Sequence, residues 1–305
     1  MLSYNDPYVS VIIPTHNRSR HLMLALRSIL NTTYSKKNLE IIIVGSILKD
    51  ALERIKYIKK NTDVKIEVIN LKHNTYPSIA RVVGFLRSKG KYILSMDDDC
   101  VLDKNTINEL VKVMMINSKV GGVGPAVHRY SDKKIQYSGA LITPVFIPLR
   151  VKNGLKTIYH VEFIPGTITM FSRRALEKSG LWDYVNFPWH AEDADLCVRL
   201  RKKGFLIGVA PYVKAYHLKA TLIDVSSAYR AYFSGRSRII FYRRHLSKWK
   251  FVVYFLTVNI AIIMFYTMYL LFKKRSLAML REYIRGVVHG LTFKIAENVK
   301  YALRH

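Results

Sequence analysis

Residues 89–100 read KGKYILSMDDDC, an apolar run that ends in three consecutive aspartates. The run Tyr92–Met96 predicts a buried strand, with Asp97–Asp99 at its carboxyl end. Like charges this close repel each other unless a cation or hydrogen-bond donors neutralise them. Oxygen ligands suit Mg²⁺ or Mn²⁺, and open α/β sheets bind ligands at the carboxyl ends of strands. Two interpretations follow: a metal that holds a phosphorylated substrate, or an acidic turn capping a helix that begins near Lys104.

The sequence on either side of this run alternates apolar runs with segments of helical periodicity. Strands alternating with helices at this pitch indicate βαβ units and a mostly parallel sheet. From about Gly121 to Gly166 the pattern loosens into shorter strands and loops. We therefore expect an α/β protein with a nucleotide-binding half (1–120) and an irregular acceptor half (121–246). The predicted strands are residues 8–14, 39–44, 64–70, 92–96 and 209–216, and the predicted helices are residues 20–30, 50–60, 78–89, 105–116, 173–179 and 192–203.

The charge balance points to an anionic partner. The chain has 305 residues, with 49 Lys and Arg against 21 Asp and Glu, a formal net charge of +28 at pH 7. Nucleic acid, an anionic membrane and phosphorylated substrates all suit such an excess. Cys100 and Cys197 form no CxxC pair, so a disulfide framework is not expected and a reducing compartment fits. No signal peptide is evident in the first residues.

An uncharged segment, FVVYFLTVNIAIIMFYTMYLLF, occupies residues 251–272. Its 22 residues are long enough to cross a bilayer as a helix, and Trp249 and tyrosines near its ends suit membrane interfaces. The alternative is a buried core helix, although soluble helices of this length usually carry charges on one face. We expect a single transmembrane segment over residues 247–275. Both flanks are basic, so the positive-inside rule gives no orientation, and a shallow hairpin remains an alternative.

The tail, residues 276–305, carries apolar residues at three- and four-residue spacing on an otherwise basic helix. This pattern predicts an amphipathic helix that lies on a membrane surface. The alternative is packing against the main domain. The stripe consists of Leu277, Leu280, Ile284, Val287, Leu291, Ile295, Val299 and Ala302.

Six segments occur in a fixed order: YVSVIIPTHNR, LEIIIV, KGKYILSMDDDC, GTITMFSRRALEKSGLWD, HAEDADLCVRLRKKGF and VAPYVKAYH. In this order and spacing they resemble family 2 of the inverting, nucleotide-sugar-dependent glycosyltransferases over residues 8–246. The resemblance implies a GT-A fold, a single Rossmann-like αβα domain over residues 1–246. It also implies metal-assisted transfer of a sugar from a nucleotide-sugar donor to a hydroxyl of a glycan or lipid-linked acceptor.

The resemblance assigns donor-binding roles to the loop after the first strand and to two further residues. An Arg with small polar groups at a strand's carboxyl end suits an anionic ligand, although Asn17 and Ser19 could equally cap the next helix. Arg81 resembles the Arg of an Ala-Arg-Asn element that faces the nucleotide, but Val82 follows it; an exposed surface Arg is the alternative. The donor-binding residues implied are Pro14, Thr15, Asn17, Arg18, Arg81, Asp97 and Asp98.

The metal site implied by the resemblance uses Asp97 and Asp99 as an Asp-x-Asp motif. The divalent ion, Mg²⁺ or Mn²⁺, would bridge the two phosphates and stabilise the leaving nucleoside diphosphate. His217, at the end of the last predicted strand, resembles a histidine that some members place near the metal and diphosphate. A strand-end histidine without a role is the alternative.

Catalysis and acceptor binding are assigned to the second half. Acidic residues at a helix start are common for reasons of the helix dipole, but the resemblance makes Asp193 the general base, with Glu192 as a neighbour or substitute. A carboxylate within hydrogen-bond reach of the attacking hydroxyl is what this chemistry needs. Gly166 would let substrate approach the backbone. The acceptor-binding residues implied are Gly166, Thr167, Trp189 and His190, and Trp182 is assigned equally to an acceptor wall or to core packing.

The chain departs from the family pattern after the second strand. The acidic residues that usually grip uracil and ribose are replaced by Gly45, Ser46 and Ile47, so UDP cannot be assumed. An inactive, nucleotide- or membrane-binding member is the alternative function. Because the positive charge crowds the apolar segment and no nucleic-acid-binding motif is present, nucleic acid is not expected as a partner. We expect instead a nucleotide-sugar donor, an acceptor at an anionic membrane, and a catalytic domain that faces the cytoplasm.

Overall fold

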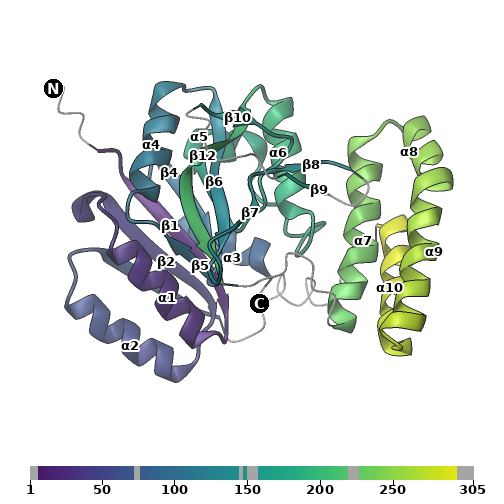
Figure 1. The fold of residues 1–305 in the computed structure, drawn as a ribbon, viewed down its shortest axis with the longest axis horizontal. Helices are drawn as coiled ribbons and strands as arrows, with labels where there is room; N and C mark the ends of the chain where they lie inside the picture. Colours follow the sequence, from purple (N-terminus) through teal and green to yellow (C-terminus); the bar gives the residue numbers. More distant parts are fainter. Residues whose placement is uncertain (1–5, 72–75, 144–146, 150–156, 219–226, 294–305) are drawn as a thin grey trace.

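The computed structural model describes residues 6–71, 76–143, 147–149, 157–218 and 227–293. A twisted sheet lies between two helical layers, and a separate group of helices flanks it (Figure 1). The strands are β1 Val9–His16, β2 Leu39–Ser46, β3 Lys65–Asn70, β4 Tyr92–Met96, β5 Cys100–Leu102, β6 Val120–Arg129, β7 Ile135–Tyr137, β8 Ala140–Leu141, β9 Ile147–Pro148, β10 Tyr159–His160, β11 Ile168–Ser172 and β12 Leu206–His217.

The first six helices agree closely with those predicted from periodicity, whereas the helix over Ala228–His245 was not predicted. The helices are α1 Ser19–Leu30, α2 Lys49–Lys60, α3 Pro77–Arg87, α4 Thr106–Ile116, α5 Arg173–Ser179, α6 Glu192–Lys202, α7 Ala228–His245, α8 Lys248–Tyr254, α9 Ile260–Met268 and α10 Leu277–Leu291. Three short helical segments complete them: a 3₁₀ turn, Lys36–Asn38, and two π-helical stretches, Phe255–Asn259 and Tyr269–Lys273.

The sheet order is β10-β12-β6-β11-β4-β1-β2-β3, with β5 paired to β12 and β7 to β6. The mostly parallel sheet predicted from the sequence is confirmed for the first half, where β4, β1, β2 and β3 run parallel. The second half is mixed, because β11 enters antiparallel between β4 and β6. Ile168 lies opposite Met96, so β11 begins where β4 ends. This register places the loop before β11 beside the three aspartates.

Alternation along the strands fills a core on each face of the sheet. Val11 and Ile13 of β1 pack with α1, α2 and α4 on one face. Ile12 points to the other face, where α3, α5, α6 and part of α7 pack. Period-2 side chains in the strands and period-3.6 side chains in the helices therefore give the αβα sandwich of a GT-A fold.

The acidic-turn interpretation of Asp97–Asp99 is wrong. The short strand β5 follows the aspartates directly, and α4 begins only at Thr106. Asp103 serves the helix start instead, since its side chain accepts the Asn105 N–H at 3.2 Å. The aspartates thus lie at the sheet edge and not at a helix start.

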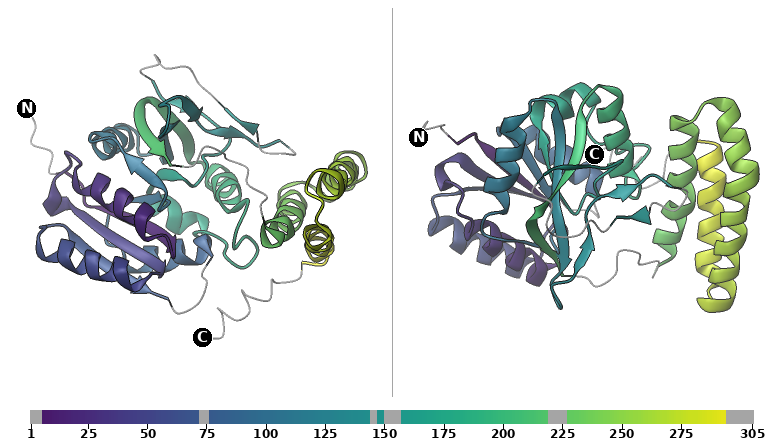
Figure 2. Two further views of the ribbon diagram at one scale, coloured as in Figure 1. Left: turned by 60° about the horizontal axis from the view of Figure 1, so that its bottom comes forward. Right: turned by 45° about the horizontal axis from the view of Figure 1, so that its top comes forward.

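α8 and α9 are joined by the π-helical stretch Phe255–Asn259, and the stretch Tyr269–Lys273 follows α9. Together they make one continuous helix over Lys248–Lys273, called the long helix below. The long helix, α7 and α10 form a bundle beside the sandwich. Among the described residues the long helix is the one helix long and apolar enough to cross a membrane, and only 6% of its apolar window is buried. The alternative of a buried core helix is therefore wrong. Figure 2 shows α7 between the sandwich and the other two helices.

The helix α10 packs closely on α7 through glycines. A Cβ on Gly286 would lie 2.0 Å from the Tyr232 carbonyl oxygen, and one on Gly235 would lie 2.7 Å from the Tyr283 carbonyl oxygen. Small residues of this kind let two helix backbones approach each other. Packing against the rest of the protein, the alternative for the tail, is thus seen for α10.

The buried face of α10 differs from the predicted stripe. Val287 of the stripe is buried as predicted, and Leu280 and Leu291 pack partly buried beside it. Met279 and Tyr283, which are not in the stripe, are also buried, whereas Leu277 and Ile284 are exposed. The interhelical contact selects the side that bears glycines, which hydrophobic periodicity alone does not weigh. Ile295, Val299 and Ala302 lie outside the described residues.

Candidate active site

Arg81 of α3 is the centre of the site, and it is almost wholly buried, with 2% of its surface exposed. Its guanidinium lies 2.9 Å from Asp97 Oδ1, 3.1 Å from Glu192 Oε1 and 3.6 Å from Asp193 Oδ1. Its Nε donates to Ser95 Oγ at 3.1 Å. The surface-arginine alternative is therefore wrong. The N–H groups of Arg81 are directed at protein carboxylates, so it holds the acidic residues together, and its predicted contact with the nucleotide stays a prediction.

The aspartates at the end of β4 meet the loop after β1. Thr15 Oγ1 donates to Asp98 Oδ2 at 2.7 Å. Arg18, about one-third exposed, donates from Nη1 to Asp98 Oδ1 at 3.2 Å and to Asp99 Oδ2 at 3.1 Å. The structure thus brings the predicted donor-binding residues Thr15, Arg18 and Asp98 together at one edge of the sheet. In all, five site carboxylates face two guanidinium groups. This imbalance of charge suits a bound cation.

Local backbone geometry shapes the loop that follows β1 and Pro14. Asn17 has a left-handed conformation, with φ of 53°, and its Oδ1 accepts from Ser46 Oγ at 3.0 Å. The alternative that Asn17 and Ser19 cap α1 is not observed, because α1 has no side-chain cap hydrogen bond. Gly45 has φ of 145°, and a Cβ there would lie 1.8 Å from the Thr15 carbonyl oxygen. Position 45 therefore has no room for the side chain of an acid, because the backbones of β1 and β2 meet closely here.

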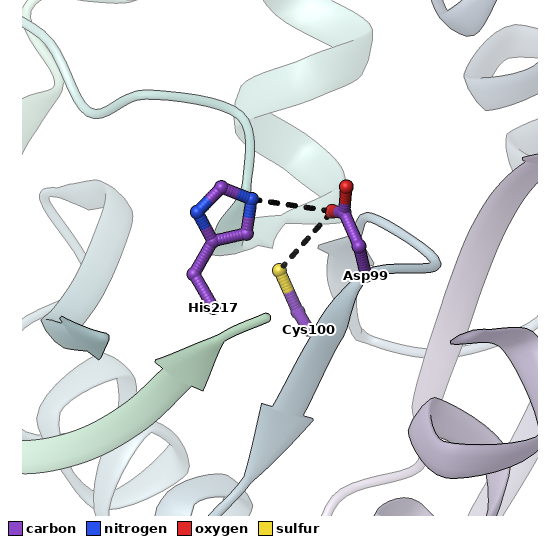
Figure 3. Close-up of side chains that lie close together, drawn as sticks. All are labelled: Asp99, Cys100 and His217. Carbon is purple, nitrogen blue, oxygen red and sulfur yellow. Dashed lines mark hydrogen bonds and ion pairs between the residues drawn. The ribbon is translucent and has the colours of Figure 1, made fainter. Parts of the chain in front are cut away.

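His217, at the end of β12, and Asp99, directly before β5, face each other (Figure 3). His217 Nε2 lies 3.4 Å from Asp99 Oδ1, and Cys100 Sγ lies 4.0 Å from the same oxygen. On its other side, His217 Nδ1 lies 3.0 Å from Gln136 Oε1. In the tautomer that donates Nδ1–H to Gln136, Nε2 presents its lone pair toward the carboxylate. Two electron-rich atoms facing in this way fit a cation between them.

The donor atoms are suited to a divalent ion, with one difference from the predicted set. Potential ligand atoms of Asp99, Cys100 and His217 all lie within 4.8 Å of one another. A carboxylate with an imidazole suits Mn²⁺ and similar ions, whereas a thiol prefers softer metals. Among the described residues, Asp97 is not part of this group, because its Oδ1 is paired with Arg81. Of the predicted ligands, the structure brings together Asp99 and His217.

Gln136 was not predicted as the hydrogen-bond partner of His217. Its position depends on β7 and β12 both pairing with β6. Replacing it with alanine is expected to weaken Mn²⁺ binding about 10- to 100-fold, since the partner that orients a ligand histidine is lost. Calorimetric Mn²⁺ titration measures the effect. In Gln136→Glu an oxygen can still accept from Nδ1–H, so we expect binding within a few-fold of wild type. Unchanged affinity in Gln136→Ala would contradict the assignment of His217.

The helix α6 begins immediately at its two acidic residues. His190 and Ala191, with φ of 69° and 66°, are both left-handed and turn the chain sharply into the helix. Such strained non-glycine backbone is characteristic of functional sites. Asp193 Oδ2 accepts the Gly166 N–H at 2.8 Å. Asp193 Oδ1 is buried beside Arg81, 3.6 Å from its Nη1, and has no hydrogen-bond partner among the described residues, so this oxygen keeps a hydrogen-bond acceptor capacity that no described donor fills.

Glu192 is a buried carboxyl group that keeps its proton to a higher pH than usual. It is 7% exposed and accepts from Arg81 at 3.1 Å. Burial and the nearby Asp193 carboxylate outweigh Arg81 and raise the pKa of Glu192 to about 8. Burial and the neighbouring carboxylates likewise raise the pKa of Asp97 to about 7, against the opposing effect of Arg81. Near neutral pH Glu192 is thus mostly protonated. The choice of Asp193 as the base rests on geometry, because Asp193 Oδ1 has no hydrogen-bond partner among the described residues, whereas Glu192 Oε1 accepts from Arg81.

Gly166 makes room for the carboxylate of Asp193. A Cβ on Gly166 would lie 2.3 Å from both Asp193 carboxylate oxygens. The sequence-based explanation, that this glycine lets substrate approach the backbone, is therefore incomplete, because Asp193 fills the space. The next residue, Thr167, is 9% exposed and accepts the Asp97 N–H through its carbonyl oxygen at 2.9 Å. The loop before β11 thereby joins the two acidic segments.

The substitution Gly166→Ala is expected to lower kcat about 100-fold, because the new methyl group displaces the Asp193 carboxylate by about 1 Å. The KM for the donor should change little. Steady-state kinetics measures both constants, and thermal unfolding checks that the fold is intact. Wild-type kcat in this variant would show that the position of Asp193 does not matter.

The aromatic residues predicted for the acceptor side lie in different environments in the structure. Trp182 is 1% exposed and packs edge-to-face on Phe171 at 5.6 Å, so it belongs to the core. Trp189 is half-buried beside Tyr229 of α7, with ring centroids 5.5 Å apart. The exposed His190 lies next to Trp189 in the turn that precedes α6. Trp189 and His190 thus precede Asp193 in the turn into α6, and their contact with the acceptor stays a prediction, while Trp182 is a core residue.

Asp195 was not singled out from the sequence, yet it ties α6 to α7. It is fully buried, and its carboxylate lies 2.8 Å from Arg199 Nε, 2.8 Å from His245 Nε2 and 3.3 Å from Arg244 Nη1. Arg244 also pairs with Asp183 at 2.6 Å. The acidic repeat in EDAD could have signalled this residue, but only the fold brings the end of α7 beside it.

A three-layered αβα sandwich with carboxylates at the end of β4 and at the start of α6 defines the GT-A class of sugar-transfer folds. The model of the Glycosyl transferase family 2 matches residues 10–180. The chain therefore belongs to glycosyl transferase family 2, as its six ordered segments predicted.

Relatives in sequence carry glycosyltransferase names. The probable glycosyltransferase YdaM of Bacillus subtilis is 29% identical over 216 residues, which are 67% of this chain and 49% of YdaM. An uncharacterized glycosyltransferase of Rickettsia conorii is 35% identical over 180 residues, covering 57% of this chain and 28% of that protein. Poly-beta-1,6-N-acetyl-D-glucosamine synthase of Staphylococcus epidermidis is 26% identical over 183 residues, covering 57% and 42%. The chain thus spans about half or less of these relatives.

Two solved structures share the fold. The mannosyltransferase PcManGT from Pyrobaculum calidifontis, in complex with GDP-Man and Mn²⁺, has a TM-score of 0.61 at 16% identity, covering 96% of this chain and 89% of that one. GalNAc-T7 with UDP, GalNAc and Mn²⁺ has a TM-score of 0.60 at 18% identity, covering 71% and 45%. These likenesses confirm the GT-A fold.

Proposed function

We propose that the protein is an inverting glycosyltransferase that moves a sugar from a nucleoside-diphosphate sugar to a hydroxyl group of a membrane-associated acceptor. The observation that carries this proposal is the link through Arg81 between Asp97, at the donor edge, and Asp193, at the start of α6. One guanidinium holds the two acidic segments in a fixed relation, as a direct displacement between donor and acceptor requires.

Asp193 is the proposed base. Its Oδ1, without a hydrogen-bond partner among the described residues, takes the proton of the acceptor hydroxyl as that oxygen attacks the anomeric carbon. The bond from the anomeric carbon to the diphosphate oxygen breaks on the opposite face, so the configuration inverts. Arg81 keeps the carboxylates in place during this step.

The donor occupies the edge formed by Thr15, Asn17 and Arg18 together with Asp98. Arg18, partly exposed at this edge, has the charge and reach to contact the diphosphate. Asp99 and His217 would hold a divalent ion such as Mn²⁺, which supplies positive charge to the leaving nucleoside diphosphate. GalNAc-T7 and PcManGT, which share the fold, are both described with Mn²⁺. Because glycine at position 45 is not an acid of the kind that grips uracil, we propose no particular nucleobase for the donor.

The acceptor is proposed to be a glycan or a lipid-linked sugar at the membrane. The turn that carries Trp189 and His190 rests directly on α7: Ser237 Oγ donates to the Trp189 carbonyl oxygen at 3.1 Å, and Arg236 Nη1 donates to the Asn186 carbonyl oxygen at 2.6 Å. The acceptor side is thus continuous with the helices that include the apolar long helix. Nucleotide sugars are cytosolic, so the catalytic domain would face the cytoplasm, with the long helix as its anchor.

A nucleotide panel tests this function. We expect UDP, GDP, dTDP, CDP or ADP, one of them preferentially, to raise the Tm of the detergent-purified protein when Mn²⁺ or Mg²⁺ is present. EDTA should abolish the shift, and so should Asp99→Asn, which removes a proposed ligand charge. The absence of a metal-dependent shift with every nucleotide would contradict the proposal and favour an inactive member of the family.

A further inference from the structure

The long helix has two unlike sides. One side faces α7 and α10 and carries the buried residues Tyr254, Asn259 and Leu270. The opposite side is apolar and open, with Leu256, Met264, Phe265, Met268 and Phe272 each more than half exposed. A helix with one open apolar side along its length suits an apolar partner.

Polar contacts show which part of the long helix lies beside α7 and α10. Arg238 of α7 donates from Nε to Asn259 Oδ1 at 3.2 Å and from Nη2 to Tyr283 Oη of α10 at 2.8 Å. The ring of Tyr283 lies 4.7 Å from that of Tyr266. Asn259 and Tyr266 are near the middle of the uncharged run 251–272. α7 and α10 therefore lie beside the middle of the long helix, as Figure 2 shows.

Charged side chains lie at this same level. Arg281 and Arg285 flank Tyr283 on α10, and both are exposed. If the long helix crossed a bilayer, its uncharged residues would fill the hydrocarbon core of about 30 Å. Arg281 and the partly exposed ion pair of Arg285 with Glu282, 3.3 Å apart, would then lie near the centre of the bilayer. Charged side chains at that depth are strongly disfavoured, and Arg281 has no ion pair among the described residues.

The catalytic domain adds a second obstacle to crossing. Arg236 and Ser237, next to Arg238 on α7, contact the 186–189 segment of the sandwich. That segment consequently lies at the level of the middle of the long helix, on the far side of α7. A crossing helix would bring polar loops of the catalytic domain to the depth of the lipid tails, where irregular backbone exposed to lipid is not tolerated.

We propose that the long helix lies parallel to the bilayer surface, with its open apolar side in the interfacial region and both of its ends on the same side of the membrane. Leu277, Ile284 and Val288 of α10, also exposed, add apolar area on the outside of the bundle. Exposed lysines and arginines at both ends, Lys248 and Lys250 before and Lys273, Lys274 and Arg275 after, complement anionic headgroups. An in-plane helix with these features is characteristic of monotopic proteins.

This arrangement replaces the single-pass crossing expected from composition. It also brings the turn with Trp189 and His190, which contacts α7, near the membrane surface rather than at the end of a long tether. The orientation of the helix does not depend on the proposed sugar transfer, so a protein without activity could still confirm it.

Thiol labelling in sealed membrane vesicles tests the inference. Single cysteines are introduced as Lys248→Cys and Lys274→Cys at the two ends of the long helix, and as Lys56→Cys on the exposed side of α2 in the catalytic domain. The native Cys100 and Cys197 are buried, and the wild-type protein serves as their control. We expect an impermeant maleimide to label all three variants from the same side. Labelling of Lys274→Cys from the side opposite to Lys56→Cys would overturn the proposal.

Depth measurements separate a bilayer from a second copy of the chain as the partner. A fluorophore at Leu256→Cys, Phe265→Cys or Phe272→Cys, in vesicles of phosphatidylcholine and phosphatidylglycerol, should be quenched by lipids labelled near the headgroup to a similar degree at all three positions. Deep quenching at Phe265 alone would indicate crossing. Insensitivity to every lipid quencher, together with a dimer in solution, would show that protein covers this side and would also overturn the proposal.

Discussion

Asp193→Asn is expected to lower kcat by about 10²- to 10⁴-fold, which is the usual contribution of a positioned general base. The amide is nearly isosteric, and its oxygen can still accept the Gly166 N–H that Asp193 accepts at 2.8 Å. Binding of the donor and metal should therefore stay near wild type. Steady-state kinetics gives kcat, and the metal-dependent Tm shift with the nucleotide gives donor binding.

Glu192→Gln is the matched control for Asp193→Asn. Because the pKa of Glu192 is raised to about 8, this carboxyl group is mostly protonated at pH 7 and resembles the amide that replaces it. A glutamine oxygen can still accept from Arg81. We expect kcat near pH 7 to fall by no more than a few-fold. Loss of activity in Glu192→Gln with activity kept in Asp193→Asn would assign the base to Glu192 instead.

Glu192→Gln is also expected to change how the free energy of unfolding depends on pH. The folded-state pKa of Glu192 is above its ordinary value of 4.5, so the folded state binds the proton more tightly than the unfolded state. The stabilisation is complete below about pH 4.5 and is lost as the pH rises through about 8. Glu192→Gln should flatten this loss, seen as a smaller decrease in unfolding free energy between pH 5 and pH 8.

Arg81→Ala is expected to have the largest effect on stability. The guanidinium contacts Asp97, Glu192 and Asp193 in a buried position, and its removal leaves three nearby carboxylates without that cation. Breaking a buried ion pair in this way costs about 3–5 kcal/mol. Without Arg81 the raised folded-state pKa values of Asp97 and Glu192 rise further, so the deficit should grow from pH 5 to pH 8. Denaturant unfolding at several pH values measures it, and sugar transfer should be lost.

Arg87→Ala provides the comparison on the same helix. Arg87 Nε pairs with Glu67 Oε1 at 2.7 Å, but the Arg87 side chain is 62% exposed. An exposed pair of this kind contributes about 0–1 kcal/mol, so stability and activity should remain near wild type. If Arg81→Ala behaved like Arg87→Ala, the central role given to Arg81 would be wrong.

The sequence predicted the parts of the site that follow local patterns. The strand Tyr92–Met96 matches β4, and the aspartates after it lie at a strand end because apolar runs and polar edges alternate along the chain. The acidic pair at Glu192 begins α6 as predicted. Such features depend on a few neighbouring residues, which is why periodicity finds them.

Features that depend on segments far apart in the chain were not predictable in this way. Arg81 gains its role only when α3, β4 and α6 meet, and from the sequence it could equally have been a surface residue. Gly166 is required because a carboxylate 27 residues later lies against it. Gln136 acts through the pairing of β7 and β12 with β6. In each case the role of the residue depends on a tertiary contact, which local propensity does not predict.

The way in which the bundle associates with a membrane was likewise not predictable from the apolar segment alone. Composition marked the long helix correctly as apolar, but its relation to the bilayer depends on α7 and α10 beside it. The glycines of α10 and the contact from Arg238 to Asn259 fix those neighbours. Hydropathy considers one segment at a time and therefore favours crossing.

The most direct test of the account is the anomeric configuration of the first product. With the donor identified by the nucleotide panel, and with water as acceptor, proton NMR recorded before mutarotation shows which anomer of the free sugar appears first. We expect the configuration opposite to that of the donor, formed only with the divalent ion and far more slowly in Asp193→Asn. Release of the sugar with the donor's own configuration, or at an unchanged rate in Asp193→Asn, would contradict direct displacement assisted by this carboxylate.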